Sequence, residues 1–125
     1  MLKECLLVML GGGFGAVFRY IISNLLSKRF DRTHWATFWV NTSGCFLMGL
    51  LLEILLGHTN YLYTFIIIGI IGSYTTFSTF EYENIDLIAH EQYAEFLKYS
   101  TYSCIFGILG IFLGLYVGEI IKFVF

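Results

Sequence analysis

The sequence has 125 residues, of which 58% are hydrophobic and only 13% are charged. Soluble domains carry about a quarter charged residues, so this composition excludes an ordinary soluble fold and predicts that most of the chain lies in lipid. The formal net charge of −2 gives no basic surface, and we expect no nucleic-acid partner. The length allows a single domain, residues 1–125, and the three scattered cysteines lack the CxxC spacing of a redox or metal site.

Four apolar segments predict membrane-spanning helices at residues 5–26, 35–57, 62–83 and 97–121. Each is near the roughly 20 residues that a bilayer requires, and each must be helical because unpaired backbone groups are too costly in lipid. The first segment follows Lys3, as the apolar part of a signal peptide follows a basic residue. It lacks a clear cleavage site, so we expect it to be retained as the first span.

The orientation of these spans is only weakly specified by charge. An even number of spans places both termini on one side, with Lys3 and Lys122, whereas the other side carries Lys28, Arg29, Arg32 and Lys98. This weak bias permits insertion in both directions, and hence an antiparallel dimer, but it equally permits a single orientation. Four helices can hardly enclose a private aqueous path, so we expect a dimer, with close helix packing at glycine stripes such as Gly110, Gly114 and Gly118.

Two polar side chains lie within the first and second spans. Arg19 is deep in the first span, where a charge is costly unless it faces protein or water. It could attract anions into a vestibule or pair with a carboxylate such as Glu83, and the sequence leaves both interpretations open. Asn41, in "WVNTSGCFLMG", must hydrogen-bond either to a neighbouring helix or to a permeating species.

The third span changes character at "GSYTTFSTF", residues 72–80, where hydroxyl groups and two phenylalanines follow a purely apolar run. The chain has no proline, so we expect glycine to break this helix at Gly72, with the break extending to Thr75. A break frees carbonyls that can coordinate a cation and amides that favour an anion. Phe77 and Phe80 share a helix face, where they either simply pack or present ring edges to an anion. Ser78 and Thr79 supply hydroxyl donors beside them.

The fourth span places Tyr99, Ser103 and Gly107 on one face at four-residue intervals. Taken alone, this face is weak evidence for a pathway, because serine hydroxyls often bond to their own helix backbone. We expect no enzymatic activity, because the sequence shows no nucleophile–base pair, phosphate loop or metal-ligand spacing.

Three segments, taken in order, resemble the Fluc (CrcB) family of fluoride channels: "GGGFGAVFRY", "NTSGCFLMG" and "GSYTTFSTFEYE". The resemblance covers essentially the whole chain, and the third segment is the most specific. It implies an all-α membrane protein of four transmembrane helices with a broken third helix. It further implies a multi-pass, plasma-membrane location and an antiparallel, dual-topology homodimer in lipid. Such a dimer would have two fluoride pathways and a structural sodium ion (Na+) at its centre.

The same resemblance implies roles for individual residues. The backbone carbonyls of Gly72 and Thr75 would hold the Na+, and Arg19 would stand at an anion vestibule. The fluoride pathway would be lined by Asn41, Phe77, Ser78, Thr79, Phe80, Glu83, Tyr99 and Ser103. The fourth-span residues match the family least closely, because Gly107 has no hydroxyl at the next position on their face.

The resemblance therefore implies a passive channel that exports fluoride and so lowers its cytoplasmic concentration. The alternative is a small four-span multidrug exporter, which is also often dual-topology but uses a membrane-embedded Glu in its first span, where this chain has Arg19. A third class, a membrane subunit without transport activity, would not need Asn41 together with "TTFSTF".

Overall fold

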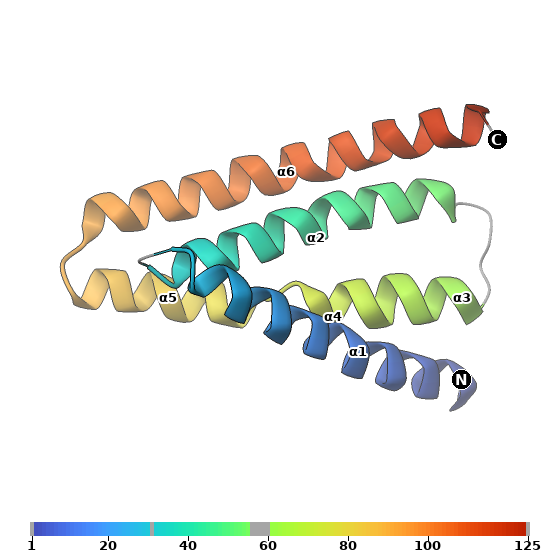
Figure 1. Cartoon of the computed structure of the whole chain (residues 1–125), viewed down its shortest axis with the longest axis horizontal. Helices are drawn as coiled ribbons and strands as arrows, with labels where there is room; N and C mark the ends of the chain where they lie inside the picture. The colour runs from blue at the N-terminus through green and yellow to red at the C-terminus, as the bar shows by residue number, and fades with distance from the viewer. Residues whose placement is uncertain (1, 31, 56–60, 125) are drawn as a thin grey trace.

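The computed structural model describes residues 2–30, 32–55 and 61–124, which form an all-α bundle of four helical rods (Figure 1). The first rod is α1 (Leu2–Ser27) and the second is α2 (His34–Ile54). The third contains α3 (Tyr61–Tyr63), η1 (Thr64–Ile71), α4 (Gly72–Tyr74) and α5 (Phe77–Ala89), and the fourth is α6 (Tyr93–Val124). All four are long and apolar enough to cross a membrane, which confirms the predicted four-span fold with a broken third helix.

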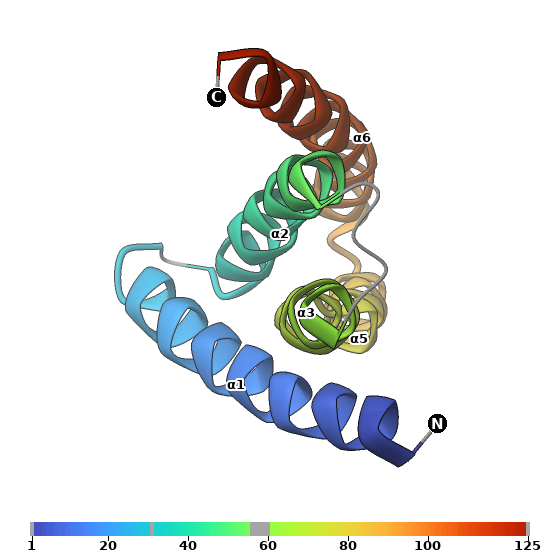
Figure 2. The ribbon, with the colours of Figure 1, turned by 90° about the vertical axis from the view of Figure 1, so that its right-hand side faces the viewer.

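The helix α2 is central to the bundle. Viewed along the rods, α2 lies between α6 and the third rod, and α1 crosses the outer side of the third rod at a slant (Figure 2). The start of α1 and the end of α6 lie at the same end of the bundle, as an even number of spans requires (Figure 1). A cluster of buried side chains, Phe38, Leu87 and Tyr99, joins α2, α5 and α6.

Glycines set the spacing between α2 and α6. Gly49 faces the backbone of Ile111 and Gly114 faces the backbone of Phe46, so closely that a Cβ atom at either glycine would overlap a carbonyl oxygen. The predicted stripe on α6 is therefore a packing face. Helices gain little from the hydrophobic effect when they associate in lipid, so this close backbone approach supplies the dispersion contacts that hold the pair together.

The helix α1 packs on the third rod in the same way. Gly11 and Gly15 face the backbone carbonyls of Phe65 and Ile70, in the segment where the third rod is π-helical. Helices of this kind are rare and often lie near functional sites. The contact brings the middle of α1, and with it Arg19, toward the part of the third rod that follows η1.

The third rod continues past residue 83, where the sequence predicts its end. The last turns of α5 remain helical because Asn84 and Leu87 are buried, and the Asn84 side chain accepts a hydrogen bond from the Ser100 hydroxyl of α6 at 2.9 Å. Much of the segment between the predicted third and fourth spans, residues 84–96, is therefore helical.

The actual connection is short because α5 ends in a left-handed cap. Glu91 has φ 58°, and the Gln92 amide returns to the Leu87 carbonyl at 2.8 Å. As a result α6 begins at Tyr93, before residue 97, where the sequence predicts its start. The predicted end of the second span at residue 57 lies outside the described residues, as does most of its connection to the third.

We expect Gly114→Ala to weaken the packing of α2 on α6, because the added methyl group would overlap the backbone of Phe46. Overpacking of this kind costs about 1–3 kcal/mol. The variant should unfold at a lower temperature than the parent in detergent, as measured by scanning fluorimetry. Gly13→Ala is the control, because nothing lies within 4 Å of a Cβ atom there. Equal thermal stability of the two variants would contradict the role given to Gly114.

Candidate functional site

The helical path of the third rod is interrupted at Thr75 and Thr76. Both residues are extended, with ψ angles of 157° and 121°. The sequence predicts a break from Gly72 to Thr75, and Thr75 is extended, but Gly72 is helical with φ −59° and ψ −31°, so the predicted start of the break is wrong. A side-chain oxygen rather than a flexible glycine stabilises the new helix start: the Thr76 hydroxyl caps α5 by accepting the Thr79 amide at 3.3 Å.

Asn41 holds the broken backbone from α2. Its Oδ1 accepts the Thr76 amide at 2.8 Å, and its Nδ2 donates to the Thr76 carbonyl at 2.9 Å. In an unbroken helix the Thr76 amide would donate to the Gly72 carbonyl, so this clamp deprives Gly72 of its helical donor. Asn41 therefore joins two helices, which is one of the two interpretations that the sequence leaves open. Its amide still has a second N–H to offer another acceptor.

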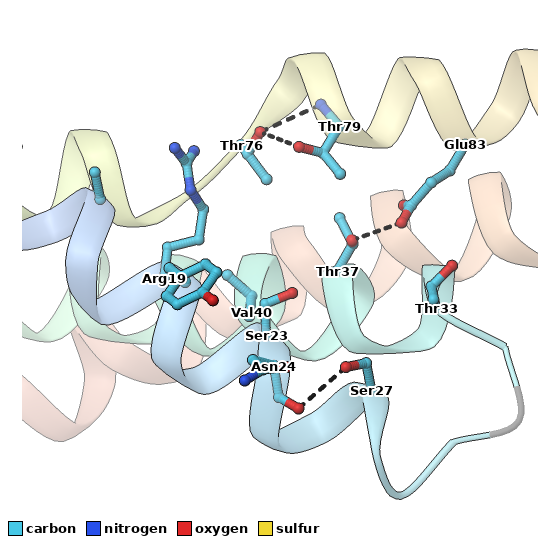
Figure 3. Close-up of a pocket in the computed structure, with 12 residues that line it drawn as sticks. Arg19, Ser23, Asn24, Ser27, Thr33, Thr37, Val40, Thr76, Thr79 and Glu83 are labelled. Atoms are coloured by element: carbon cyan, nitrogen blue, oxygen red, sulfur yellow. Dashed lines mark hydrogen bonds between the residues drawn. The ribbon is translucent and has the colours of Figure 1, made fainter.

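Arg19 reaches the same break from α1. Its Nη1 donates to the Thr75 carbonyl at 3.2 Å, and the side chain points toward the break and away from Glu83 (Figure 3). Arg19 forms no ion pair with any carboxylate of the described residues. The interpretation in which Arg19 pairs with Glu83 is therefore wrong, and the Arg19 guanidinium instead lies beside the break.

A polar cavity of about 440 Å³ lies between α1, the start of α2 and α5 (Figure 3). Arg19 and Glu83 both line it, and most of its other lining residues carry a hydroxyl or amide group, among them Ser23, Asn24, Ser27, Thr33, Thr37, Thr76 and Thr79. The α1 members of this set are not predicted from the sequence. The spacing along the chain could have indicated two of them: Ser23 and Ser27 follow Arg19 at four-residue intervals, which places all three on one helix face.

Glu83 is held at the wall of this cavity by two hydroxyl groups. Thr37 of α2 donates to its Oε1 at 2.9 Å, and Tyr99 of α6 donates to its Oε2 at 2.7 Å. The Tyr99 side chain is fully buried, and its ring centroid lies 5.2 Å from that of Phe80. Tyr99 thus connects the carboxylate to the phenylalanines. Thr37 is not predicted from the sequence, because only the fold brings it to Glu83.

A second cavity, of about 390 Å³, shares Thr76 with the first but is lined mainly by apolar groups. Phe77 and Phe80 border it with ring centroids 6.0 Å apart, and Asn41 and Ser103 contribute polar atoms. The Ser103 hydroxyl is buried and has no hydrogen-bond partner among the described residues. A buried hydroxyl without a partner is costly, which makes Ser103 a candidate donor for a species that enters the cavity its residue lines.

Most of the predicted pathway residues line one of two neighbouring cavities. The apolar cavity is lined by Asn41, Phe77, Phe80 and Ser103, and the polar cavity by Arg19, Thr79 and Glu83. Ser78, which is exposed, and Tyr99, which is fully buried, line neither cavity. The Ser78 hydroxyl lies 3.4 Å from that of Thr76. Gly72 is also exposed, and Phe77 is 74% exposed, so one face of the break is uncovered in a single chain.

Comparison with known proteins gives the family. The model for CrcB-like proteins, described as Camphor Resistance (CrcB), matches residues 6–115, which is most of the chain. The chain belongs to the CrcB-like family. This confirms the resemblance carried by the three sequence segments.

Relatives of this family match the chain almost end to end. The fluoride-specific ion channel FluC 2 of Bacillus thuringiensis subsp. konkukian is 41% identical over 119 residues, covering 94% of this chain and 98% of that protein. The fluoride-specific ion channel FluC of Phocaeicola vulgatus is 36% identical over 121 residues, covering 94% and 100%. That of Acidobacterium capsulatum is 41% identical over 116 residues, covering 90% and 93%.

Family membership also decides two broader predictions. The CrcB-like relatives are ion channels by name, which confirms that the chain is not an enzyme. With four helices able to span a membrane, the chain is a multi-pass protein of the plasma membrane.

We expect Asn41→Leu to destabilise the helix break, because the Thr76 amide and carbonyl would lose their partners inside the bilayer. Each buried group left unpaired costs about 1–3 kcal/mol. Amide hydrogen exchange in the peptide that contains Thr76 should therefore accelerate, as measured by mass spectrometry. Asn24→Leu is the matched control, since its exposed side chain forms no hydrogen bond within the described residues. Unchanged exchange in Asn41→Leu would rule out the clamp.

Proposed function

We propose that this chain is a fluoride-selective passive channel that exports fluoride and lowers its cytoplasmic concentration. One observation carries the proposal: Ser103, whose buried hydroxyl has no partner among the described residues, lines the same cavity as Asn41 and the Phe77–Phe80 pair. A donor without an acceptor, placed beside ring edges, suits a small anion. The printed names of the relatives support fluoride as that anion.

The physical difficulty for such a channel is the removal of water from fluoride. Moving even a carboxylate-sized ion into a low-dielectric interior has an idealised cost on the order of 20 kcal/mol, and fluoride is smaller. A pathway must therefore replace water with donors at each step and still release the ion. Asn41 and Ser103 offer N–H and O–H groups, and Phe77 and Phe80 offer the positive edges of their rings. Chloride fits these donors poorly because it is larger.

The polar cavity serves as the anion vestibule in this proposal. Arg19 uses one N–H for the Thr75 carbonyl and has further donors and a full charge with which to attract anions. Thr79 accepts the Thr76 hydroxyl at 3.0 Å, which leaves its own O–H free to donate. The Glu83 carboxylate is occupied by Thr37 and Tyr99, as described above. Ser78 is exposed in a single chain. In this proposal it lines the pathway once a second chain covers it.

The proposed assembly is an antiparallel, dual-topology homodimer embedded in lipid. Irregular backbone does not face lipid within a bilayer, because its polar groups would be unpaired there. The break nevertheless has an uncovered face in a single chain, with Gly72 and the largely exposed Phe77. A second copy related by a two-fold axis would cover this face with the same face of its own. The weak charge bias of the loops is compatible with insertion in both orientations.

A sodium ion would be held at the centre of this dimer by the Gly72 and Thr75 carbonyls. No group of three or more His, Cys, Asp or Glu suited to a metal occurs among the described residues, so a cation depends on backbone oxygens. The Gly72 carbonyl has lost its helical donor, and the Thr75 carbonyl keeps one lone pair beside its bond from Arg19. These oxygens fit a hard cation, which would tie the two helix breaks together.

Native mass spectrometry of the purified protein tests the dimer and the ion together. We expect a dimer that retains a single Na+ when the protein is prepared in sodium. After exchange into a potassium buffer the mass shift of Na+ should disappear. No shift of K+ should replace it, because the carbonyl cage suits the smaller Na+ and not K+. A monomer would count against the assembly, and a dimer without bound sodium would count against the ion.

The conduction pathway is tested by fluoride efflux from liposomes, read with a fluoride electrode and compared with chloride efflux. Phe77→Ile and Phe80→Ile should abolish fluoride efflux while the protein remains folded, because an aliphatic side chain has no positive ring edge. Ser103→Ala should slow efflux about fivefold, the effect of one lost hydrogen bond of about 1 kcal/mol.

Two substitutions serve as controls for this experiment. Phe112→Ile changes a phenylalanine that is 66% exposed and lines neither cavity, and Thr101→Val removes an exposed hydroxyl of the same helix as Ser103. Both should conduct like the parent. Efflux without preference for fluoride in the parent would refute the proposed function, and normal efflux in both Phe77→Ile and Phe80→Ile would refute the role of the rings.

A further inference from the structure

A cluster of polar side chains surrounds Glu95 in the first turn of α6, outside both cavities. The Glu95 Oε1 accepts Trp35 Nε1–H at 3.3 Å, lies 3.3 Å from His34 Nε2, and lies 3.6 Å from Arg32 Nη1. A carboxylate only accepts hydrogen bonds, so this geometry requires the proton of His34 on Nε2. One oxygen of α6 therefore gathers two groups from the beginning of α2 and a third, Arg32, from the segment just before it.

Two of these groups are packed on the ring of Tyr99. The His34 ring, which is 5% exposed, has its centroid 5.0 Å from that of Tyr99, and the Trp35 ring lies edge-on to Tyr99 at 6.3 Å. Phe80 covers the Tyr99 ring as well, at 5.2 Å. These aromatic neighbours limit the directions in which the Tyr99 hydroxyl can point. In the structure it points at Glu83 Oε2, 2.7 Å away.

We propose that Glu95 is a positioning residue for the conduction pathway. It fixes His34 and Trp35 by accepting their N–H groups, these two rings hold Tyr99, and Tyr99 in turn keeps its hydroxyl on Glu83 beside Phe80. The inference rests on the proposed function, because it assigns Tyr99 to the pathway. Neither Glu95 nor Tyr99 lines a cavity, so the effect of Glu95 on the ion passes through Tyr99 to Glu83, which lines the polar cavity.

A double-mutant cycle in the fluoride-efflux assay tests this chain of contacts. The variants are Glu95→Ala, Tyr99→Phe and the two combined, each checked for an elution profile like that of the parent. Glu95→Gln keeps an oxygen that can accept both N–H groups but removes the charge. The control is Glu119→Ala, which removes an exposed carboxylate near the other end of α6 that lies at neither cavity.

We expect Glu95→Ala and Tyr99→Phe each to slow fluoride efflux about fivefold, as the loss of one hydrogen bond does. The combined variant should conduct no more slowly than Tyr99→Phe alone, because residues that act through one another are not additive. Glu95→Gln should restore efflux to near the parental rate, and Glu119→Ala should leave it unchanged.

Three results would overturn the inference. Parental efflux in Glu95→Ala or in Tyr99→Phe would show that the contact does not matter, and losses that multiply in the combined variant would show that Glu95 acts independently of Tyr99. If Glu95→Ala does not fold, Glu95→Asp replaces it, since its shorter side chain falls short of the donors of α2. It should then slow efflux in the parent but not in Tyr99→Phe. A parent that conducts no fluoride refutes the proposed function instead, whatever Glu95 does.

Discussion

The pair of hydrogen bonds between Asn41 and the Thr76 backbone is the constraint on which the rest of the site depends. A helix in lipid satisfies its own backbone, and extended residues at its middle would leave an N–H and a C=O unpaired. The Asn41 amide supplies one acceptor and one donor, as a neighbouring peptide would. Because Asn41 does so, the Gly72 carbonyl loses its helical donor, the Thr75 carbonyl is reached by Arg19, and α5 starts as a separate helix.

The start of α5 after the break also explains why the two neighbouring cavities differ in polarity. Thr76 belongs to both walls, and beyond it α5 is amphipathic. Thr79 and Glu83, four residues apart, line the polar cavity together with α1, whereas Phe77 and Phe80, three residues apart, line the apolar cavity together with α6. In the proposed pathway this arrangement lets an anion exchange water for fixed donors before it meets the ring edges.

The four spans, the existence of a break and the family can be predicted from the sequence, because span length and motifs belong to contiguous residues. The place of the break cannot, since glycine points to Gly72 whereas the decisive partner, Asn41, is 35 residues from Thr76 along the chain. Ser23 is missed because helix periodicity does not say which face meets a neighbour. The contacts of Glu95 are missed because they need α6 to begin before the predicted residue 97.

One face of α2 brings these separate contacts into register. Its members follow one another at intervals of three or four residues and so point the same way: His34, Thr37, Asn41 and Gly44. Each contacts one partner in turn: His34 contacts Tyr99, Thr37 contacts Glu83, Asn41 contacts Thr76, and Gly44 contacts Tyr74. These contacts follow one another along α2 toward the centre of the bundle. The same helix is fixed on α6 by glycine contacts that leave no room for sliding. A shift of α2 would therefore disturb all of these contacts together. That coupling explains how a break can persist in mid-membrane although each hydrogen bond that holds it has a net worth of only about 1 kcal/mol.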